Sequence, residues 1–169
     1  PWNSAIFRLM RRASKSYDWL ILGSIHAVEA ITNRFNKLSI DFKFLDQIKI
    51  ATVGSATTKS LNIYGIKSDF LTTYQGSESI VKSFNDQNIT GQRILIPSSD
   101  IGGHNLEKGL SLMGNMVERI DAYRNLIPKS ARKESMGALQ KGIDIIILTS
   151  ASTATNLCSV LDKDIEKLA

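Results

Sequence analysis

YDWLILGSIHAVEAI, residues Tyr17–Ile31, is the stretch of sequence that indicates the fold most directly. A short apolar run, Trp19–Leu22, stops at Gly23 and Ser24, and a pattern with helical spacing begins after the serine. The chain repeats this arrangement, with few identities, in GIDIIILTSASTATNL, residues Gly142–Leu157. A strand that leads directly into a helix is typical of a parallel sheet, whose strands are joined by helical crossovers. The repeat indicates two similar domains.

The rest of the chain alternates between apolar, β-prone runs and helical patterns. We expect strands at Trp19–Leu22, Ile48–Val53, Asp69–Thr73, Arg93–Ile96, Met116–Tyr123 and Ile145–Leu148. We expect helices at His26–Asn36, Ala56–Tyr64, Glu78–Phe84, His104–Met113 and Thr153–Leu168, with Gly65 and Gly114 ending two of them. This alternation predicts an α/β fold of the flavodoxin-like type, with a mostly parallel sheet and helices on both faces.

A domain boundary is indicated by NLIPKSARKE, residues Asn125–Glu134. Pro128 is unsuited to a central strand, and Ser130 could cap a helix that runs to about Gln140. Residues 1–121 hold enough units for a complete domain, whereas residues 129–169 hold only a helix, a strand and a helix. Because three elements make a poor core, we expect the second domain to be completed by chain outside this sequence.

Composition limits the class of protein. The 169 residues are 43% hydrophobic and include a single cysteine, Cys158, which excludes an internal disulfide framework and suits the cytoplasm. No apolar run has the length of a membrane span, and no signal peptide pattern opens the sequence. We therefore expect a cytoplasmic protein without membrane association.

The formal net charge is +5. Such an excess is typical of an ordinary basic surface, and it also suits the attraction of an anionic ligand. One tight basic cluster comprises Arg8, Arg11, Arg12 and Lys15. It looks like the solvated face of a first helix and lacks aromatic residues for stacking, so we do not expect nucleic acid as a partner.

Small polar residues follow four of the expected strands. They are Gly23 and Ser24, Gly54–Thr58, Pro97–Asp100 (with Ser98) followed by Gly102–His104, and Thr149–Thr153 (with Ser150 and Ser152). Helix capping alone accounts for such residues. In a parallel sheet, however, all four would lie at the edge where helix N-termini offer free N–H groups to anions.

Several kinds of site are not indicated. The sequence contains neither a G-x-x-x-x-G-K-[ST] nor a G-x-G-x-x-G phosphate motif, and no G-x-S-x-G elbow. His26 and His104 have no partner at metal-ligand spacing. We therefore expect a protein that binds an anionic molecule without a metal or cofactor.

Four segments, in order, resemble uroporphyrinogen-III synthases. YDWLILGSIHAVEAI is similar to the family segment Y/F-D-W-[LIV]-[IV]-[FL]-T-S-x-x-A-V. The others are KIATVGSATTKSLNIYGIKSDF (Lys49–Phe70), GQRILIPSSDIGGHNLEKGLSLMGNMVERIDAYRN (Gly91–Asn125) and GIDIIILTSASTATNL (Gly142–Leu157). Three positions depart from the family pattern: Gly23 replaces Thr, Asn125 replaces Thr, and Ala151 replaces Pro.

The resemblance implies two α/β domains joined by a two-stranded linker, with one domain inserted into the other. By that pattern, residues 1–121 are the inserted domain and residues 122–128 are the returning linker strand. Residues 129–169 then begin the remainder of the outer domain, which is incomplete in this chain.

The resemblance also implies a reaction and a set of site residues. The family cyclises hydroxymethylbilane, a linear tetrapyrrole with eight carboxylates, and inverts its last pyrrole ring to give uroporphyrinogen III. Tyr123 falls on the family's linker tyrosine, a candidate acid, although it could equally be an aromatic that covers the domain junction. The expected substrate-binding residues are Ser24, Thr57, Ser98, Ser150 and Ser152.

Two other functions fit the sequence. A non-catalytic α/β module that binds an anion or a sugar phosphate would use similar Ser/Thr-rich loops. A degenerate synthase-like domain would serve only protein contacts. For the synthase we expect a monomer without a cofactor.

Overall fold

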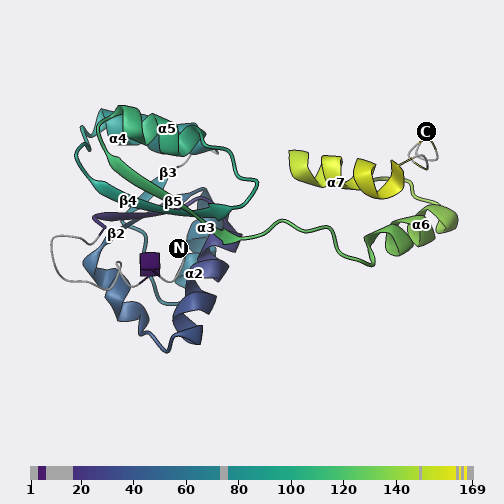
Figure 1. The fold of residues 1–169 in the computed structure, drawn as a ribbon, viewed down its shortest axis with the longest axis horizontal. Coiled ribbons are helices and arrows are strands. Elements are labelled where there is room, and N and C mark those ends of the chain that lie inside the picture. Colours follow the sequence, from purple (N-terminus) through teal and green to yellow (C-terminus); the bar gives the residue numbers. More distant parts are fainter. Residues whose placement is uncertain are drawn as a thin grey trace. The chain divides into compact units, whose positions relative to one another are not determined.

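The computed structural model describes residues 4–6, 17–72, 76–148, 150–162, 164 and 166. The basic cluster expected on a first helix, the end of the strand expected at Thr73, and Thr149 lie outside these residues. The chain divides into two compact units, Pro1–Asn125 and Leu126–Ala169 (Figure 1).

The first unit is built on a five-stranded parallel sheet with the order β3-β2-β1-β4-β5 (Figure 1). The strands are β1 (Trp19–Leu22), β2 (Lys49–Val53), β3 (Phe70–Thr72), β4 (Arg93–Ser99) and β5 (Met116–Tyr123). The helices are α2 (Ile25–Lys37), α3 (Ser55–Asn62), α4 (Ser77–Asp86) and α5 (Asn105–Leu112), with a 3-10 helix η1 (Phe42–Gln47) that the sequence analysis did not foresee. The expected α/β fold with a parallel sheet is confirmed.

β1 lies at the centre of the sheet, and its two faces belong to different cores. Leu20 and Leu22 pack in a cluster with α2 residues such as Phe35. Trp19 and Ile21 pack in a second cluster, which includes Phe84 of α4 and residues of α5. Because side chains alternate along a strand, a strand covered on both faces is apolar throughout. This explains the uninterrupted run WLIL.

β4 is longer than the sequence analysis predicted. It continues through Pro97 and Ser98 to Ser99, residues that were expected to form a loop. β1 pairs with β4 only at Ile94 and Leu95, so Pro97 has a strand neighbour on the β5 side alone. A proline costs no ladder hydrogen bond where one side of a strand is unpaired, which explains the longer strand.

An ion pair joins the beginnings of β1 and β4. Asp18 Oδ2 accepts a hydrogen bond from the backbone N–H of Arg93 at 2.8 Å. Its Oδ1 accepts a second hydrogen bond, from Nη2 of the Arg93 side chain, at 3.1 Å. Hydrogen bonds from the Arg93 side chain lower the pKa of Asp18, against the smaller opposing effect of burial.

The Asp18 carboxylate therefore stabilises the first unit in a pH-dependent way. A lowered folded-state pKa means that the stabilisation is present above about pH 4 and disappears as the pH falls through the folded-state pKa. We expect Asp18→Asn to lower the urea midpoint at pH 7 and to have a much smaller effect at pH 2.5. Asp86→Asn, which removes an exposed ion pair with Lys82, should change neither value. An equal loss for Asp18→Asn at both pH values would contradict this account.

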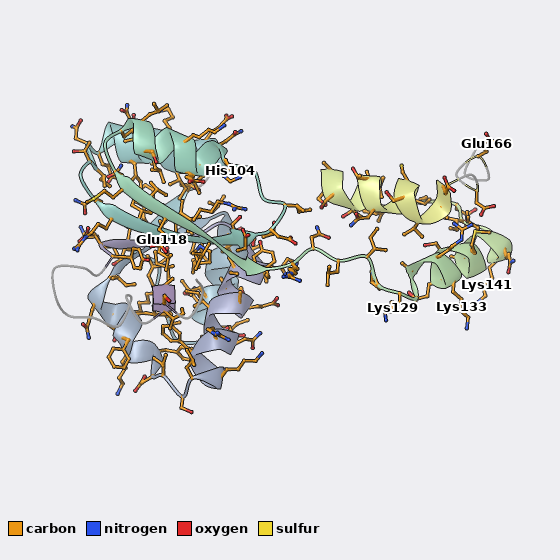
Figure 2. All side chains as sticks on the ribbon, in the orientation of Figure 1. His104, Glu118, Lys129, Lys133, Lys141 and Glu166 are labelled. Carbon is orange, nitrogen blue, oxygen red and sulfur yellow. The ribbon has the colours of Figure 1, made fainter. Side chains whose placement is uncertain are left out.

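The second unit contains two helices, α6 (Ala131–Lys141) and α7 (Ala151–Leu161). Arg132 of α6 donates to the Val160 carbonyl at 2.6 Å and to Asp164 Oδ2 at 2.8 Å, which ties the two helices together. Lys129, Lys133 and Lys141 are exposed along α6 and its approach (Figure 2).

Two sequence predictions for this unit differ from the structure of the 169 residues, and a third is met in part. Residues 145–148 form no strand, because the described part of the unit offers no second strand with which to pair. The helix expected after Ser130 is present as α6, with Ser130 at its N-cap position, but the Ser130 side chain makes no capping hydrogen bond, because its backbone is already helical. The last helix ends at Leu161, where Asp162 has a left-handed φ of 48°.

The segment between the two helices is apolar and exposed. Ile145 and Ile147 are 79% and 80% exposed, and Ile143, Ile146 and Leu148 are 40% exposed or more. Apolar side chains occur at both odd-numbered and even-numbered positions of this segment, so both faces of an extended strand would be apolar. This is typical of a strand buried on both faces.

Within the described residues, no helix combines the length and the apolar character needed to cross a membrane.

Candidate functional site

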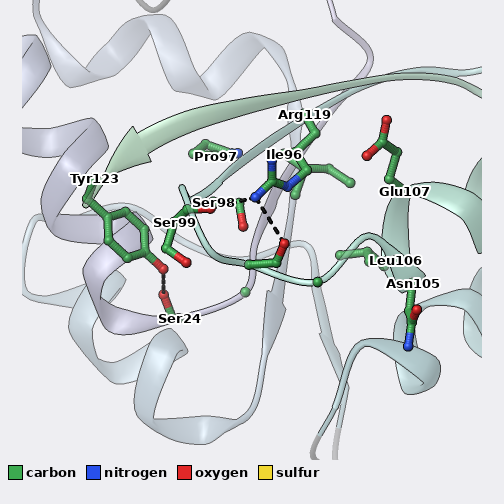
Figure 3. Close-up of a pocket in the computed structure, with 13 residues that line it drawn as sticks. Ser24, Ile96, Pro97, Ser98, Ser99, Asn105, Leu106, Glu107, Arg119 and Tyr123 are labelled. Carbon is green, nitrogen blue, oxygen red and sulfur yellow. Dashed lines mark hydrogen bonds between the residues drawn. The ribbon is translucent and has the colours of Figure 1, made fainter. Parts of the chain in front are cut away.

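A cavity of about 290 Å³ opens at the carboxyl ends of the strands of the first unit (Figure 3). Its walls come from the end of β1, the end of β4, the loop that follows β4, the first turn of α5, and β5. The lining residues are Gly23, Ser24, Ile96, Pro97, Ser98, Ser99, Gly102, Gly103, Asn105, Leu106, Glu107, Arg119 and Tyr123. This is the edge at which open parallel sheets bind their ligands.

Two hydroxyl groups meet at one side of the cavity. Ser24 Oγ lies 2.9 Å from Tyr123 Oη (Figure 3). Ser24 caps α2, because its extended backbone lets Oγ accept the N–H of Ala27 at 3.2 Å. Tyr123 is the last residue of β5, and the register between β4 and β5 shifts beside it, at Ser98 and Ser99. The imidazole of His26 lies 5.8 Å from the Tyr123 ring, centroid to centroid.

Arg119 shapes the other side of the cavity. Its Nη2 donates to the carbonyl oxygens of Ser99, at 2.5 Å, and Gly102, at 3.2 Å (Figure 3). Its Nη1 donates to Asp121 Oδ1 at 2.9 Å, and the side chain is only 11% exposed. The guanidinium therefore holds the loop after β4 against β5 and has a carboxylate partner of its own. In this arrangement Arg119 has a structural role in the wall of the cavity.

Gly102 allows this close approach. A Cβ atom at that position would collide with Ser98 Oγ and would lie 3.2 Å from Nη2 of Arg119. At the neighbouring Gly103, a Cβ atom would have no atom within 4 Å.

We expect Gly102→Ala to displace the loop and to lower the free energy of unfolding by about 1–3 kcal/mol, the usual cost of overpacking. Gly103→Ala is the matched control and should change stability by less than about 0.5 kcal/mol. Chemical denaturation of both variants measures the difference. Equal stabilities would show that the loop adapts without strain.

Apolar side chains form part of the lining, and its uncharged polar side chains are the hydroxyl groups of Ser24, Ser98, Ser99 and Tyr123 and the amide of Asn105. Glu107 is engaged with His104, whose Nδ1 lies 2.8 Å from Oε2. In the part of the chain that the structure describes, no group of three or more His, Cys, Asp or Glu side chains could hold a metal ion. Such a site can bind polar groups, orient them and supply a proton.

The structure brings together three of the six predicted site residues. Ser24, Ser98 and Tyr123 all line the cavity. Thr57 is 4% exposed and is not among the lining residues.

The remaining two predicted residues belong to the second unit. Ser150 caps α7 by accepting the N–H of Thr153 at 3.1 Å, and its Oγ lies 3.0 Å from Ser152 Oγ.

The sequence analysis missed Arg119, and it did not distinguish Gly102 from the other residues that follow this strand. The signal for Arg119 was a charged residue inside a predicted strand, preceded by Glu118 and followed by Ile120. Its partners are carbonyl groups, which carry no sequence signal. Gly102 lies in a Gly-Gly pair, and nothing in the sequence distinguishes the constrained glycine from the free one.

Comparison with known proteins gives a family for the chain. A family model described as "Uroporphyrinogen-III synthase HemD" matches residues 2–169. The chain is 32% identical over 153 residues to a uroporphyrinogen-III synthase of Synechococcus elongatus, covering 88% of this chain and 56% of the relative. It is 25% identical to a porphyrin biosynthesis protein HemD of Ruminiclostridium josui, covering 99% of this chain and 34% of the relative. The chain thus spans about a third to a half of the length of these two relatives.

Solved structures share the fold. A crystal structure of uroporphyrinogen III synthase from the extremely thermophilic bacterium Thermus thermophilus matches with a TM-score of 0.64 and 16% identity, over 99% of this chain and 63% of that one. The enzyme from Helicobacter pylori 26695 matches with a TM-score of 0.54 and 17% identity, over 85% and 62%.

Proposed function

The chain belongs to the uroporphyrinogen-III synthase family, and from this we propose that the whole protein cyclises hydroxymethylbilane to uroporphyrinogen III. The match along residues 2–169 is the observation that carries the proposal. The cavity supports it, because hydroxyl groups and helix N-termini are suited to a substrate rich in carboxylates. The alternative of a non-catalytic anion-binding module is not favoured by the family match.

In the proposed reaction, the hydroxyl group of the substrate leaves as water and a reactive azafulvene remains. This intermediate closes without help to the wrong isomer. The protein therefore has to hold the two ends of the substrate so that the last ring inverts, which is catalysis by orientation.

We propose that Tyr123 donates the proton that the departing hydroxyl group takes with it. The proton that is lost when the macrocycle closes restores the phenol, so no proton is consumed overall. Ser24 and Ser98 would bind substrate in the cavity, and the proposal extends substrate binding to Thr57, Ser150 and Ser152 by the family pattern. The protein would act as a cytoplasmic monomer.

The test is to supply hydroxymethylbilane to the whole protein and to separate the porphyrin isomers after oxidation. We expect mainly the type III isomer, at a rate above that of spontaneous closure. Type I product alone, at the spontaneous rate, would refute the proposal.

We further propose that residues 1–121 form the inserted domain, residues 122–128 a linker strand, and residues 129–169 part of an outer domain. The exposed apolar segment at residues 143–148 supports this, because a segment with apolar side chains of both parities suits a central strand. The missing partner strands would come from outside these 169 residues.

Hydrogen exchange tests this arrangement. In the whole protein, we expect the amides of residues 143–148 to be protected by about a thousandfold or more, as in a core strand. In the 169-residue chain alone, we expect exchange close to that of an unfolded peptide. Fast exchange of this segment in both forms would contradict the arrangement.

A further inference from the structure

The hydroxyl group of Ser24 occupies a position between a helix and the candidate acid. Its Oγ accepts the N–H of Ala27 at 3.2 Å and lies 2.9 Å from Tyr123 Oη (Figure 3). The cap already uses a lone pair of Oγ, and the hydroxyl hydrogen remains to be directed. Tyr123 Oη is an acceptor within reach of that hydrogen.

Both residues are held by backbone contacts on either side of this pair. Ser24 is fixed by the cap of α2 and follows the central strand after one residue, Gly23. Tyr123 is paired with Ser99 in the sheet, and its carbonyl oxygen accepts the N–H of Asp100 at 3.2 Å. The hydroxyl–hydroxyl contact joins chain positions 99 residues apart. The backbone therefore sets where the two oxygens lie, and the hydrogen bond sets which way the phenol hydrogen points.

We infer that Ser24 is the positioning residue of Tyr123: its hydroxyl donates to Tyr123 Oη and leaves the phenol hydrogen free to point at a ligand in the cavity. This rests on the proposed function for the role of Tyr123. On this inference, the main role of Ser24 is to position Tyr123, in place of the direct substrate binding given above. A donor to the phenol oxygen also stabilises the negative charge that develops there when the proton leaves.

Other polar groups also surround the phenol or share its cavity. The ring of His26 lies beside it, and Asp100 bonds its backbone, while Arg119 and Glu107 line the same cavity. Arg119 is engaged by Asp121 and two carbonyl groups, and Glu107 by His104. Among the contacts of the described residues, Ser24 is the side chain that bonds Tyr123 Oη.

Three substitutions separate positioning from capping. Ser24→Thr keeps both the cap and the hydroxyl donor. Ser24→Gly removes the hydroxyl but remains an acceptable N-cap, so the helix should be little affected. Ser24→Asp keeps the cap, but a carboxylate can only accept from the phenol and draws its hydrogen away from the cavity.

In the whole protein we expect Ser24→Gly and Ser24→Asp to lower kcat roughly fivefold to tenfold, the effect of one hydrogen bond, with KM changed less than twofold. Ser24→Thr should retain at least half of the kcat. The control is Ser79→Ala on α4, which removes an exposed hydroxyl bonded to the Gly76 carbonyl and should leave kcat unchanged. A raised KM at constant kcat in Ser24→Gly would overturn the inference and return Ser24 to substrate binding.

A second readout does not depend on turnover. The Cζ carbon of Tyr123, labelled with ¹³C and assigned by its absence in Tyr123→Phe, reports on hydrogen bonds at the phenol. A bond that the phenol oxygen accepts moves this resonance upfield, and a bond that it donates moves it downfield. We expect a downfield displacement in Ser24→Gly. An upfield displacement, or none, would overturn the inference. If the resonance moves as expected while Tyr123→Phe retains full activity, the positioning stands and the proposed acid role fails.

Discussion

Tyr123→Phe is expected to lower the kcat of the whole protein about 100-fold, at the lower end of the usual range for loss of a general acid. The substitution removes one oxygen atom and leaves the ring, which packs at the edge of the first core and beside His26. The departing hydroxyl group would then have to take its proton from water. Steady-state kinetics with hydroxymethylbilane measure the effect, and the isomer ratio shows whether the remaining turnover is still controlled.

The matched control is Tyr64→Phe. Tyr64 is also a partly buried tyrosine that packs against the first core, with its ring edge-on to Phe42, and it lies outside the cavity. Its substitution should leave kcat within twofold. Full activity of Tyr123→Phe, alongside this control, would assign Tyr123 a structural role.

The second large effect is expected on stability. Phe84→Ala should lower the free energy of unfolding of the first unit by about 3–5 kcal/mol, the usual cost of deleting a buried aromatic ring. Phe84 is fully buried, and its ring centroid lies 4.9 Å from that of Trp19 and 6.2 Å from that of Phe70. The ring thus joins α4 to the central strand and to the β3 edge, and smaller neighbours cannot fill the resulting space.

Denaturant unfolding followed by tryptophan fluorescence measures this loss. Leu112→Ala is the control, because Leu112 is 89% exposed and its truncation should cost less than about 0.5 kcal/mol. A loss below about 1 kcal/mol for Phe84→Ala would mean that the core closes around the missing ring.

How well each element could be predicted depended on where its partners lie. The bounds of β1 and β5 were predicted as observed. For β1 the reason is plain in the sequence, because the apolar run lies between Asp18 and Gly23. The end of β4 could not be predicted from the neighbouring residues. A strand can contain Pro97 only because β1 does not extend beside it, and the local sequence does not show where β1 stops pairing. The strand predicted at residues 145–148 has the right composition, but a strand exists only where another strand pairs with it.

The candidate site could likewise be predicted only where the topology of the sheet determines which residues meet. Parallel topology brings the ends of β1, β4 and β5 to one edge, so Ser24, Ser98 and Tyr123 could be expected to meet. The role of Arg119 could not be foreseen, because its partners are carbonyl groups of a loop whose path the sequence does not specify. Thr57 followed a strand like the others, yet it is buried.

The exposed apolar segment at residues 143–148 has a consequence for aggregation of the chain. Residues 143–148 combine high β-propensity with one charged residue, Asp144, and no proline, which is the composition of segments that stack into intermolecular sheets. On the arrangement proposed above, molecules that lack the partner strands of this segment would be able to associate through it. On the same proposed arrangement, folding in the cell calls for rapid pairing of this segment with its partner strands, or for a chaperone that covers it until they are available.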